Sequence, residues 1–379
     1  MGPGPSAIAP RVLEAMARPV IGHLDPEFVS LMDRIKAQLQ RAFRTDNPLT
    51  MPVSGPGSAG MESCIVNLLE PGETVVICQN GVFGGRLKAM AERCGATVVD
   101  VKDEWGRAVS PEKLASTLDR TPQARVVAFV HAETSTGALS DAAALAGIAK
   151  DYDCLTIVDA VTSLGGSPLE VDLWGLDAVY SGTQKCLSCM PGLSPLTMSS
   201  RALQKIGQRR KPVQSWFMDV TLVAGYWGGS ARRVYHHTAP VNALYGLDEA
   251  LLMLHEESME AAWLRHQRNH AVLCAGLEAL GVDFFVPPAE RIPQLNTVRV
   301  PAGINEARVR ERLLEDFDIE IGAGLGALAG KVWRIGLMGH SSRRENVMAC
   351  LAALGHLLMD EGLKVSVAEA TAEAERALR

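Results

Sequence analysis

Between residues 60 and 200 the sequence alternates between short runs rich in β-branched residues and stretches with a helical pattern. This alternation limits the possible folds more than any other feature, because strands and helices that alternate along a chain build a parallel sheet. The predicted strands are apolar throughout, which indicates that helices cover both faces of the sheet. Strands are predicted at 74–77, 96–99, 125–130, 154–158, 178–181 and 195–198, with helices at 84–94, 110–119 and 141–152 between them.

The pattern changes beyond residue 200, where two long amphipathic helices are predicted at 242–257 and 259–280. Short strands and helices follow at 296–300, 306–315, 319–321, 332–337 and 345–359, a mixture typical of a small α+β domain. We therefore expect an N-terminal arm over residues 1–13, a large domain over 14–255 and a small C-terminal domain over 256–365. The remaining residues, 366–379, are expected to form a C-terminal tail, either an Ala/Glu/Arg helix or a frayed end.

Composition excludes several classes of protein. Of the 379 residues, 47% are hydrophobic and 21% are charged, which is globular and not disordered. The net charge of -6 argues against nucleic acid and anionic membranes as partners. No apolar run approaches the ~18 residues that span a bilayer, and residues 1–5 lack the features of a signal peptide. The eight dispersed cysteines are typical of reduced thiols, so we expect a cytoplasmic protein.

Gly55, Gly57 and Gly60 satisfy the G-x-G-x-x-G pattern and open a predicted helix over residues 58–69. A dinucleotide site would also need an acidic residue about 20 positions later, where this chain has Gln79-Asn80-Gly81. An NAD-binding reductase therefore stays only as an alternative from a different class. The turn still favours a phosphate, because the start of a helix offers free N–H groups to an anion.

Cys186 and Cys189 have the CxxC spacing of a metal site. A structural zinc site needs a second pair of ligands, and no second CxxC motif or neighbouring histidine accompanies them. We predict no metal site.

Chemically distinct side chains follow four of the predicted strands. Asp159 ends one strand and Lys185 comes just after another, while Thr134 and Phe83 follow two more strand ends. Because ligands bind at the carboxyl ends of parallel strands, we expect these side chains to face one cleft beside the phosphate-binding turn.

These groups match the requirements of pyridoxal 5'-phosphate. The amine of Lys185 can form a Schiff base with the cofactor, and the carboxylate of Asp159 can hold a proton on the pyridine nitrogen. An aromatic ring such as Phe83 can stack on the cofactor, and the hydroxyl of Thr134 can lie near its phenolic oxygen. The sequence therefore predicts pyridoxal 5'-phosphate as the cofactor.

The sequence resembles the class V, fold-type I aminotransferases, and among them most closely the alanine–glyoxylate and serine–glyoxylate aminotransferases. The resemblance runs from residue 2 to about residue 358. It implies an α/β fold with a mostly parallel, mixed seven-stranded sheet, a small α+β domain, and a homodimer with shared active sites. Its most specific segments are 2–6, 47–50, 133–137, 158–163, 180–185, 235–238 and 334–337.

The resemblance also implies a role for individual residues. Lys185 matches the Schiff-base lysine, Asp159 the carboxylate at the pyridine nitrogen, and Phe83 the ring that stacks on the cofactor. Thr134 matches the hydroxyl near the phenolic oxygen. The phosphate-binding positions are matched by Pro56, Gly57, Ser58 and Gln184. Tyr235 and Thr238 match residues that reach the phosphate from the neighbouring subunit.

Arg334 matches the arginine that binds the substrate carboxylate, and its position in the sequence supports that role. In the predicted strand, Trp333 and Ile335 share one face by the period of two, so Arg334 lies on the opposite face beside Gly336. A planar guanidinium suits bidentate binding of a carboxylate.

The substrates are expected to be glyoxylate and a small amino donor, Ala or Ser. With one matched arginine, the second charge of Glu or Asp would lack a partner, unless Arg11 or Arg343 reaches the pocket. Two segments depart from the family pattern. Residues 55–58 read Gly-Pro-Gly-Ser, without the histidine that relatives carry there, and residues 186–192 replace a segment with smaller side chains. A pyridoxamine–pyruvate aminotransferase, or another small oxo-acid aminotransferase of the same family, remains the alternative within the family.

Overall fold

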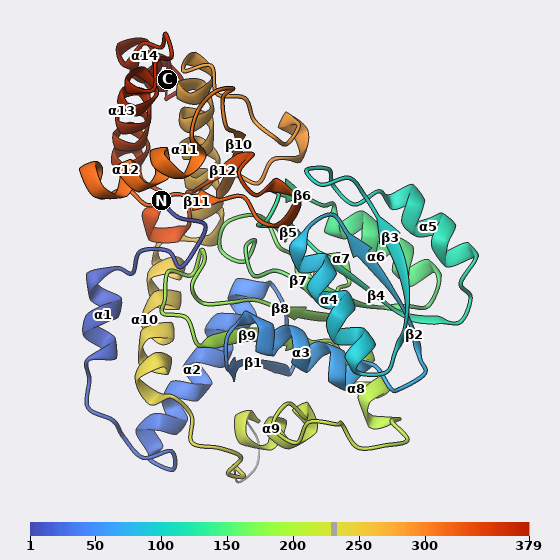
Figure 1. Cartoon of the computed structure of the whole chain (residues 1–379). Coiled ribbons are helices and arrows are strands. Elements are labelled where there is room, and N and C mark those ends of the chain that lie inside the picture. The colour runs from blue at the N-terminus through green and yellow to red at the C-terminus, as the bar shows by residue number, and fades with distance from the viewer. Residues whose placement is uncertain (229–232, 379) are drawn as a thin grey trace.

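The computed structural model describes residues 1–228 and 233–378, which form a large domain around a seven-stranded sheet and a smaller domain around a three-stranded sheet (Figure 1). The strand order of the large sheet is β1-β9-β8-β7-β4-β2-β3. Its strands are β1 (Leu49–Ser54), β2 (Thr74–Gln79), β3 (Thr97–Lys102), β4 (Ala124–Val130), β7 (Leu155–Asp159), β8 (Ala178–Tyr180) and β9 (Leu193–Met198).

Parallel pairing dominates this sheet. Strands β3, β2, β4, β7 and β8 pair in parallel, and only β9 runs antiparallel to its neighbours β8 and β1. The mostly parallel, mixed seven-stranded sheet is therefore confirmed. In the register, Val130 lies opposite Asp159, which in turn lies opposite Tyr180. The carboxyl ends of three neighbouring strands thus meet at the same edge.

Helices cover both faces of the large sheet. The chain moves in opposite directions across the sheet before and after β3, so the crossover helix α4 packs on one face and α5 and α6 on the other (Figure 1). The helices of this domain are α1 (Pro10–Met16), α2 (Pro26–Phe43), α3 (Gly57–Leu68), α4 (Val82–Arg93), α5 (Pro111–Asp119), α6 (Ala142–Asp151), α7 (Val171–Trp174), α8 (Ser200–Gly207), α9 (Val220–Trp227) and α10 (Val241–Glu257). A short hairpin of β5 (Ala132–Glu133) and β6 (Ala138–Leu139) follows β4.

The expectation that every strand is buried on both faces is wrong for β3. Strand β7 is buried along its whole length, whereas β3 buries only Val101 fully. The difference follows from position, because β3 is the edge strand beside β2 and has no neighbour on its other side.

The small domain consists of an antiparallel sheet with helices packed against it. The strands have the order β10-β12-β11, with bounds β10 (Leu295–Arg299), β11 (Gly322–Ala323) and β12 (Val332–Gly336). The helices are α11 (Met259–Ala279), α12 (Glu306–Phe317), α13 (Arg344–Asp360) and α14 (Val367–Arg376), with short 3-10 helices η1 (Pro288–Glu290), η2 (Gly326–Leu328) and η3 (Gly339–Ser341). Helix α14 is formed by residues that were expected to be a C-terminal tail. Its Ala370 and Ala374 are buried in the core of the small domain.

The strand predicted at 319–321 is wrong, because those residues lead out of α12. Asp318 adopts a left-handed conformation at the end of the helix, and the Ile319 N–H donates to the Leu313 carbonyl. The strand pairing therefore begins only at Gly322. This is a common way to end a helix, in which a left-handed residue lets the next N–H groups satisfy the last carbonyls.

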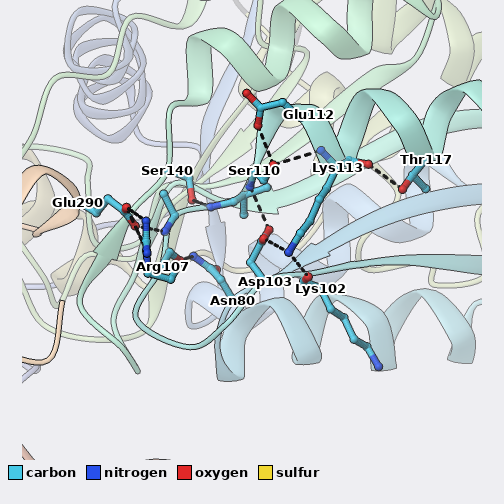
Figure 2. Close-up of polar contacts among 12 residues, drawn as sticks. Asn80, Lys102, Asp103, Arg107, Ser110, Glu112, Lys113, Thr117, Ser140 and Glu290 are labelled. Atoms are coloured by element: carbon cyan, nitrogen blue, oxygen red, sulfur yellow. Dashed lines mark hydrogen bonds and ion pairs between the residues drawn. The ribbon is translucent and has the colours of Figure 1, made fainter. Parts of the chain in front are cut away.

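Helix α11 and a salt bridge are two of the features that join the domains. Helix α11 buries Met259 and Trp263 in the large core and Val272 and Leu277 in the small core. Figure 2 shows the second feature, in which Arg107, from the loop between β3 and α5, pairs with Glu290 of η1 at 2.7 Å. In the same loop, Ser110 caps α5 by accepting from the Lys113 N–H, as its position in the sequence predicts.

None of the helices in the described ranges is long and apolar enough to cross a membrane.

Candidate active site

A cavity of about 240 Å³ opens at the carboxyl edge of the large sheet, between the ends of β4, β7 and β8 and the first turns of α3 and α4. Seven of the residues predicted from the sequence line this cavity. They are Gly57, Ser58, Phe83, Thr134, Asp159, Gln184 and Lys185. The parallel strands therefore bring together residues that are more than 120 positions apart in the sequence.

Asp159 lies at the last position of β7 and is buried. The Tyr180 hydroxyl donates to its Oδ2 at 2.7 Å, and the Val161 N–H donates to its Oδ1 at 2.9 Å. Burial raises the pKa of Asp159 to about 6, because these two hydrogen bonds only partly replace the lost water. Tyr180, which is opposite Asp159 in the register, is a site residue that the sequence analysis missed.

Lys185 follows β8 and is also buried, with 9% of its surface exposed. Burial, together with the positive charge of Arg334, lowers the pKa of Lys185 to about 8. A larger share of the amine is therefore neutral and nucleophilic near neutral pH than for an exposed lysine. Its Nζ donates a hydrogen bond to the backbone carbonyl of Pro3 at 2.5 Å.

The start of α3 forms the end of the cavity expected to bind phosphate. Pro56 is the N-cap residue and provides no side-chain hydrogen bond to the helix, so the first N–H groups lack a side-chain cap. Arg86, one turn after Phe83 on α4, also lines the cavity, and its Nη1 lies 3.1 Å from the Ser58 Oγ. Arg86 was not predicted from the sequence, although its spacing of three from Phe83 places both residues on one face of the helix.

Glu133 fixes the position of Phe83. This buried carboxylate accepts from the Phe83 N–H at 3.1 Å and from the Gly84 N–H at 3.3 Å. It also accepts from the Ser135 N–H at 3.0 Å and the Ser135 hydroxyl at 2.6 Å. Burial raises the pKa of Glu133, and the hydrogen bonds oppose that shift. The side chain thus joins the start of α4 to the segment that carries Thr134.

Arg334 lies on β12, in the small domain, with Trp333 and Ile335 buried on the opposite face as the strand period predicts. Its Nε donates to the Ala323 carbonyl at 2.8 Å and its Nη1 to the Thr134 carbonyl at 3.1 Å. Arg334 does not line the cavity itself, but its contact with Thr134 places the guanidinium directly behind the cavity wall. Further N–H groups of the guanidinium are available for a ligand.

The structure leaves other predicted residues away from this cavity. Tyr235 is half exposed, and its hydroxyl lies 3.1 Å from the Thr238 Oγ1, but neither residue lines the cavity of its own chain. Arg11 pairs with Glu256 at 2.6 Å on the surface, and Arg343 bonds His340. Neither arginine supplies a second cation to the pocket.

The residues of the cavity fit pyridoxal 5'-phosphate. Asp159 is a buried carboxylate that forms no ion pair within the described ranges, which suits it to a protonated ring nitrogen. The start of α3 lines the same cavity through Gly57 and Ser58, and it carries N–H groups suited to a phosphate.

The raised pKa of Asp159 predicts how the cofactor-free protein responds to pH. A carboxyl whose folded pKa lies above its unfolded value stabilises the fold at low pH and loses that contribution as the pH rises through about 6. The Asp159→Asn variant has no carboxyl to ionise at this position, so its stability does not fall with pH for this reason. We expect its free energy of unfolding, relative to wild type, to increase by about 2 to 3 kcal/mol between pH 4 and pH 7.

Urea denaturation of both cofactor-free proteins over that pH range measures the difference. Asp46→Asn, at an exposed position, is the control for removal of a carboxylate. A difference between Asp159→Asn and wild type that stays constant with pH would contradict the burial cost assigned to Asp159.

Comparisons with known proteins identify the family to which the chain belongs. The profile of the family described as Aminotransferase class-V matches residues 5–348. The (S)-ureidoglycine–glyoxylate transaminase of Bacillus subtilis (strain 168) is 37% identical to the chain, over 98% of this chain and 92% of that protein.

Two crystal structures are similar over nearly the whole chain. The alanine–glyoxylate aminotransferase of Nostoc sp. is 47% identical, with a TM-score of 0.92 and 94% of each chain covered. The pyridoxamine–pyruvate aminotransferase of Mesorhizobium loti is 26% identical, with a TM-score of 0.94, and the match covers 100% of this chain and 96% of that one. With this fold, this constellation at the sheet edge and a family match over most of its length, the chain belongs to the class V aminotransferases of fold type I.

Proposed function

We propose that the protein transfers an amino group from a small amino acid, Ala or Ser, to glyoxylate, with pyridoxal 5'-phosphate bound covalently to Lys185. The observation that carries the proposal is the shared cavity, in which a buried amine and a buried carboxylate lie beside an uncapped helix start. When bound, the cofactor supplies an electron sink that withdraws electrons from the amino acid's Cα.

Each side chain of the cavity has a role in this proposal. Asp159 keeps a proton on the ring nitrogen, and Phe83 packs on the ring face. Thr134 offers a hydroxyl to the phenolic oxygen. Pro56, Gly57, Ser58 and Gln184 surround the phosphate. Once Lys185 is released from the cofactor, its amine removes the proton from the Cα of the amino donor. In the second half of the reaction the same amine delivers a proton to the Cα of the new amino acid.

Arg334 binds the substrate carboxylate in this proposal. Its guanidinium is fixed by two backbone carbonyls, so little conformational entropy remains to be lost when a carboxylate binds. Arg86 lines the cavity itself, and its contact with Ser58 supports a role at the phosphate. The second charge of Glu or Asp would then be desolvated without a cation, which favours small donors.

The names of the similar proteins support glyoxylate as the acceptor, because two of them are named as glyoxylate transaminases. The likeness to a pyridoxamine–pyruvate aminotransferase keeps free pyridoxamine as a second candidate substrate. The helix start and Arg86 favour a phosphorylated cofactor over free pyridoxamine, because a ligand without an anionic group would leave the N–H groups and the guanidinium without an anion to bind.

We also propose a homodimer in which Tyr235 and Thr238 serve the partner's site. Their exposure and their absence from the cavity of their own chain support this arrangement. A cytoplasmic location is proposed from the cysteines, all eight of which are free thiols.

The donor preference tests the proposed reaction. We expect kcat/KM with glyoxylate to be higher for Ala or Ser than for Glu or Asp, and reduction with borohydride to fix the cofactor on Lys185. Lys185→Ala should abolish turnover, because it removes both the covalent attachment and the base. Higher kcat/KM for Glu or Asp than for both small donors, or a cofactor label on another lysine, would contradict the assignment.

The role of Arg86 in cofactor binding can be tested without measuring catalysis, by binding of the cofactor to the cofactor-free protein. We expect Arg86→Leu to raise the Kd of the cofactor-free protein for pyridoxal 5'-phosphate by about tenfold, since a charged hydrogen bond to the phosphate is lost. The Kd for pyridoxal, which has no phosphate, should not change. Arg93→Leu, on the exposed side of the same helix, is the control. An equal loss for both ligands would place Arg86 away from the phosphate.

The shared site can be tested with mixed dimers. One partner carries Lys185→Ala and the other carries Tyr235→Phe with Thr238→Ala. In a shared arrangement one of the two sites in each mixed dimer has its lysine and both phosphate contacts intact. We therefore expect activity to reappear when the inactive and weakened proteins are mixed and re-formed. Mixed dimers that are isolated by two affinity tags and stay inactive would rule out shared sites.

A further inference from the structure

The first residues of the chain run between the two domains and contact both. On the large domain, the Ser6 N–H donates to the Gln184 carbonyl at 2.8 Å and the Ser6 hydroxyl to the Lys185 carbonyl at 2.6 Å. On the small domain, the Gly336 N–H donates to the Met1 carbonyl at 2.7 Å. Figure 1 shows the N-terminus beside β11 and β12. We call residues 1–6 the N-terminal segment.

Within this segment the backbone carbonyl of Pro3 accepts the hydrogen bond from the Nζ of Lys185. The amine has no carboxylate partner within 4 Å among the described residues, so this carbonyl is a defined acceptor at the reactive atom. A backbone carbonyl can only accept, so it fixes the direction of an N–H bond without exchanging a proton with the amine.

Three glycines make this approach possible. Gly4 has a φ of +102°, and a Cβ there would lie 2.8 Å from the Lys185 Nζ. A Cβ on Gly336 would lie 2.0 Å from the Gly2 carbonyl oxygen, and a Cβ on Gly322 would lie 2.6 Å from Pro3. A side chain at Gly322 or Gly336 would push the segment away from the small domain, and one at Gly4 would push the segment and the Lys185 side chain apart.

We infer that the N-terminal segment is part of the active site, and that its Pro3 carbonyl positions the amine of Lys185 for proton transfer. This inference rests on the proposed function. A neutral amine has two N–H bonds and one lone pair, and a flexible four-carbon chain lets all three rotate. When one N–H bond points at Pro3, the lone pair is restricted to the two tetrahedral positions that remain on the nitrogen. Pro3 is a positioning group, because it acts through Lys185 and does not contact the substrate.

The test uses Gly4→Ala in the full-length protein. The added Cβ displaces the carbonyl from the lysine, so we expect kcat to fall by about 10- to 100-fold, as for a small misplacement of a reacting group. KM should change little, and the deuterium isotope effect with Cα-deuterated Ala should increase, because proton transfer becomes slower relative to the other steps. The Kd for pyridoxal 5'-phosphate should stay within about twofold of wild type. Gly303→Ala is the matched control, since Gly303 also has a positive φ, +84°, but no atom within 4 Å of its Cβ position.

A second measurement does not depend on turnover. In the cofactor-free protein, the segment covers the Lys185 amine, so acylation by a limiting amount of acetic anhydride should label Lys185 several-fold faster in Gly4→Ala than in wild type. The other lysines in the same sample serve as internal references. Ser6→Ala, which removes the hydroxyl bond to the Lys185 carbonyl, should give the same changes to a smaller extent and covers the case that Gly4→Ala does not fold.

The outcomes separate this inference from the proposed function. If wild type shows no transfer with any amino donor, the proposed function fails, and the acylation result alone decides whether the segment holds the lysine. If wild type transfers amino groups but Gly4→Ala and Ser6→Ala show unchanged kcat, isotope effect and acylation, the inference is wrong. It is also wrong if Gly303→Ala loses as much activity as Gly4→Ala, or if Gly4→Ala loses cofactor binding.

Discussion

The burial of the Asp159 carboxylate is the constraint on which the rest of the site depends. A carboxylate at the end of a buried strand is costly unless a cation or several donors compensate it. The protein provides one hydroxyl, from Tyr180, and one N–H, from Val161, and the pKa near 6 shows that these donors leave part of the cost in place. A cationic ring nitrogen would remove that remaining cost, so in the proposed function the incomplete compensation of Asp159 favours binding of such a cofactor.

The same principle explains how the supporting residues are distributed. Glu133 is a second buried carboxylate close to Asp159, and its negative charge contributes to the raised pKa of Asp159. Unlike Asp159, it receives four hydrogen bonds, from Phe83, Gly84 and Ser135. A satisfied carboxylate rigidifies the structure around it, whereas an incompletely satisfied one is available to a ligand. Glu133 therefore holds Phe83 in place, whereas Asp159 keeps the free capacity that the proposed cofactor would use.

The part of this architecture that could be predicted from the sequence is the part set by local pattern. Apolar runs located the strands, and strand ends located Asp159, Thr134 and Lys185, because the edge of a parallel sheet follows directly from strand order. Exposure of β3 was missed because a run of valines does not show whether the strand has a neighbour on both sides. Arg86, Tyr180 and Glu133 were missed for a different reason. Their importance comes from contacts with residues far away in the chain, and the apolar pattern around each of them carries no signal for such contacts.

The residues of the proposed reaction come from both domains, so the relative placement of the domains bears on that proposal. Lys185 and Asp159 belong to the large sheet, whereas Arg334 is on β12 of the small domain and reaches the cavity only through the Thr134 carbonyl. A rotation of the small domain would move Arg334 relative to Lys185 by an amount that grows with distance from the hinge. Helix α11, the Arg107–Glu290 pair and the N-terminal segment each connect the domains at a different place. These connections together restrict rotation of the small domain, so the distance between the amine and the guanidinium depends on the packing of both domains and not on either domain alone.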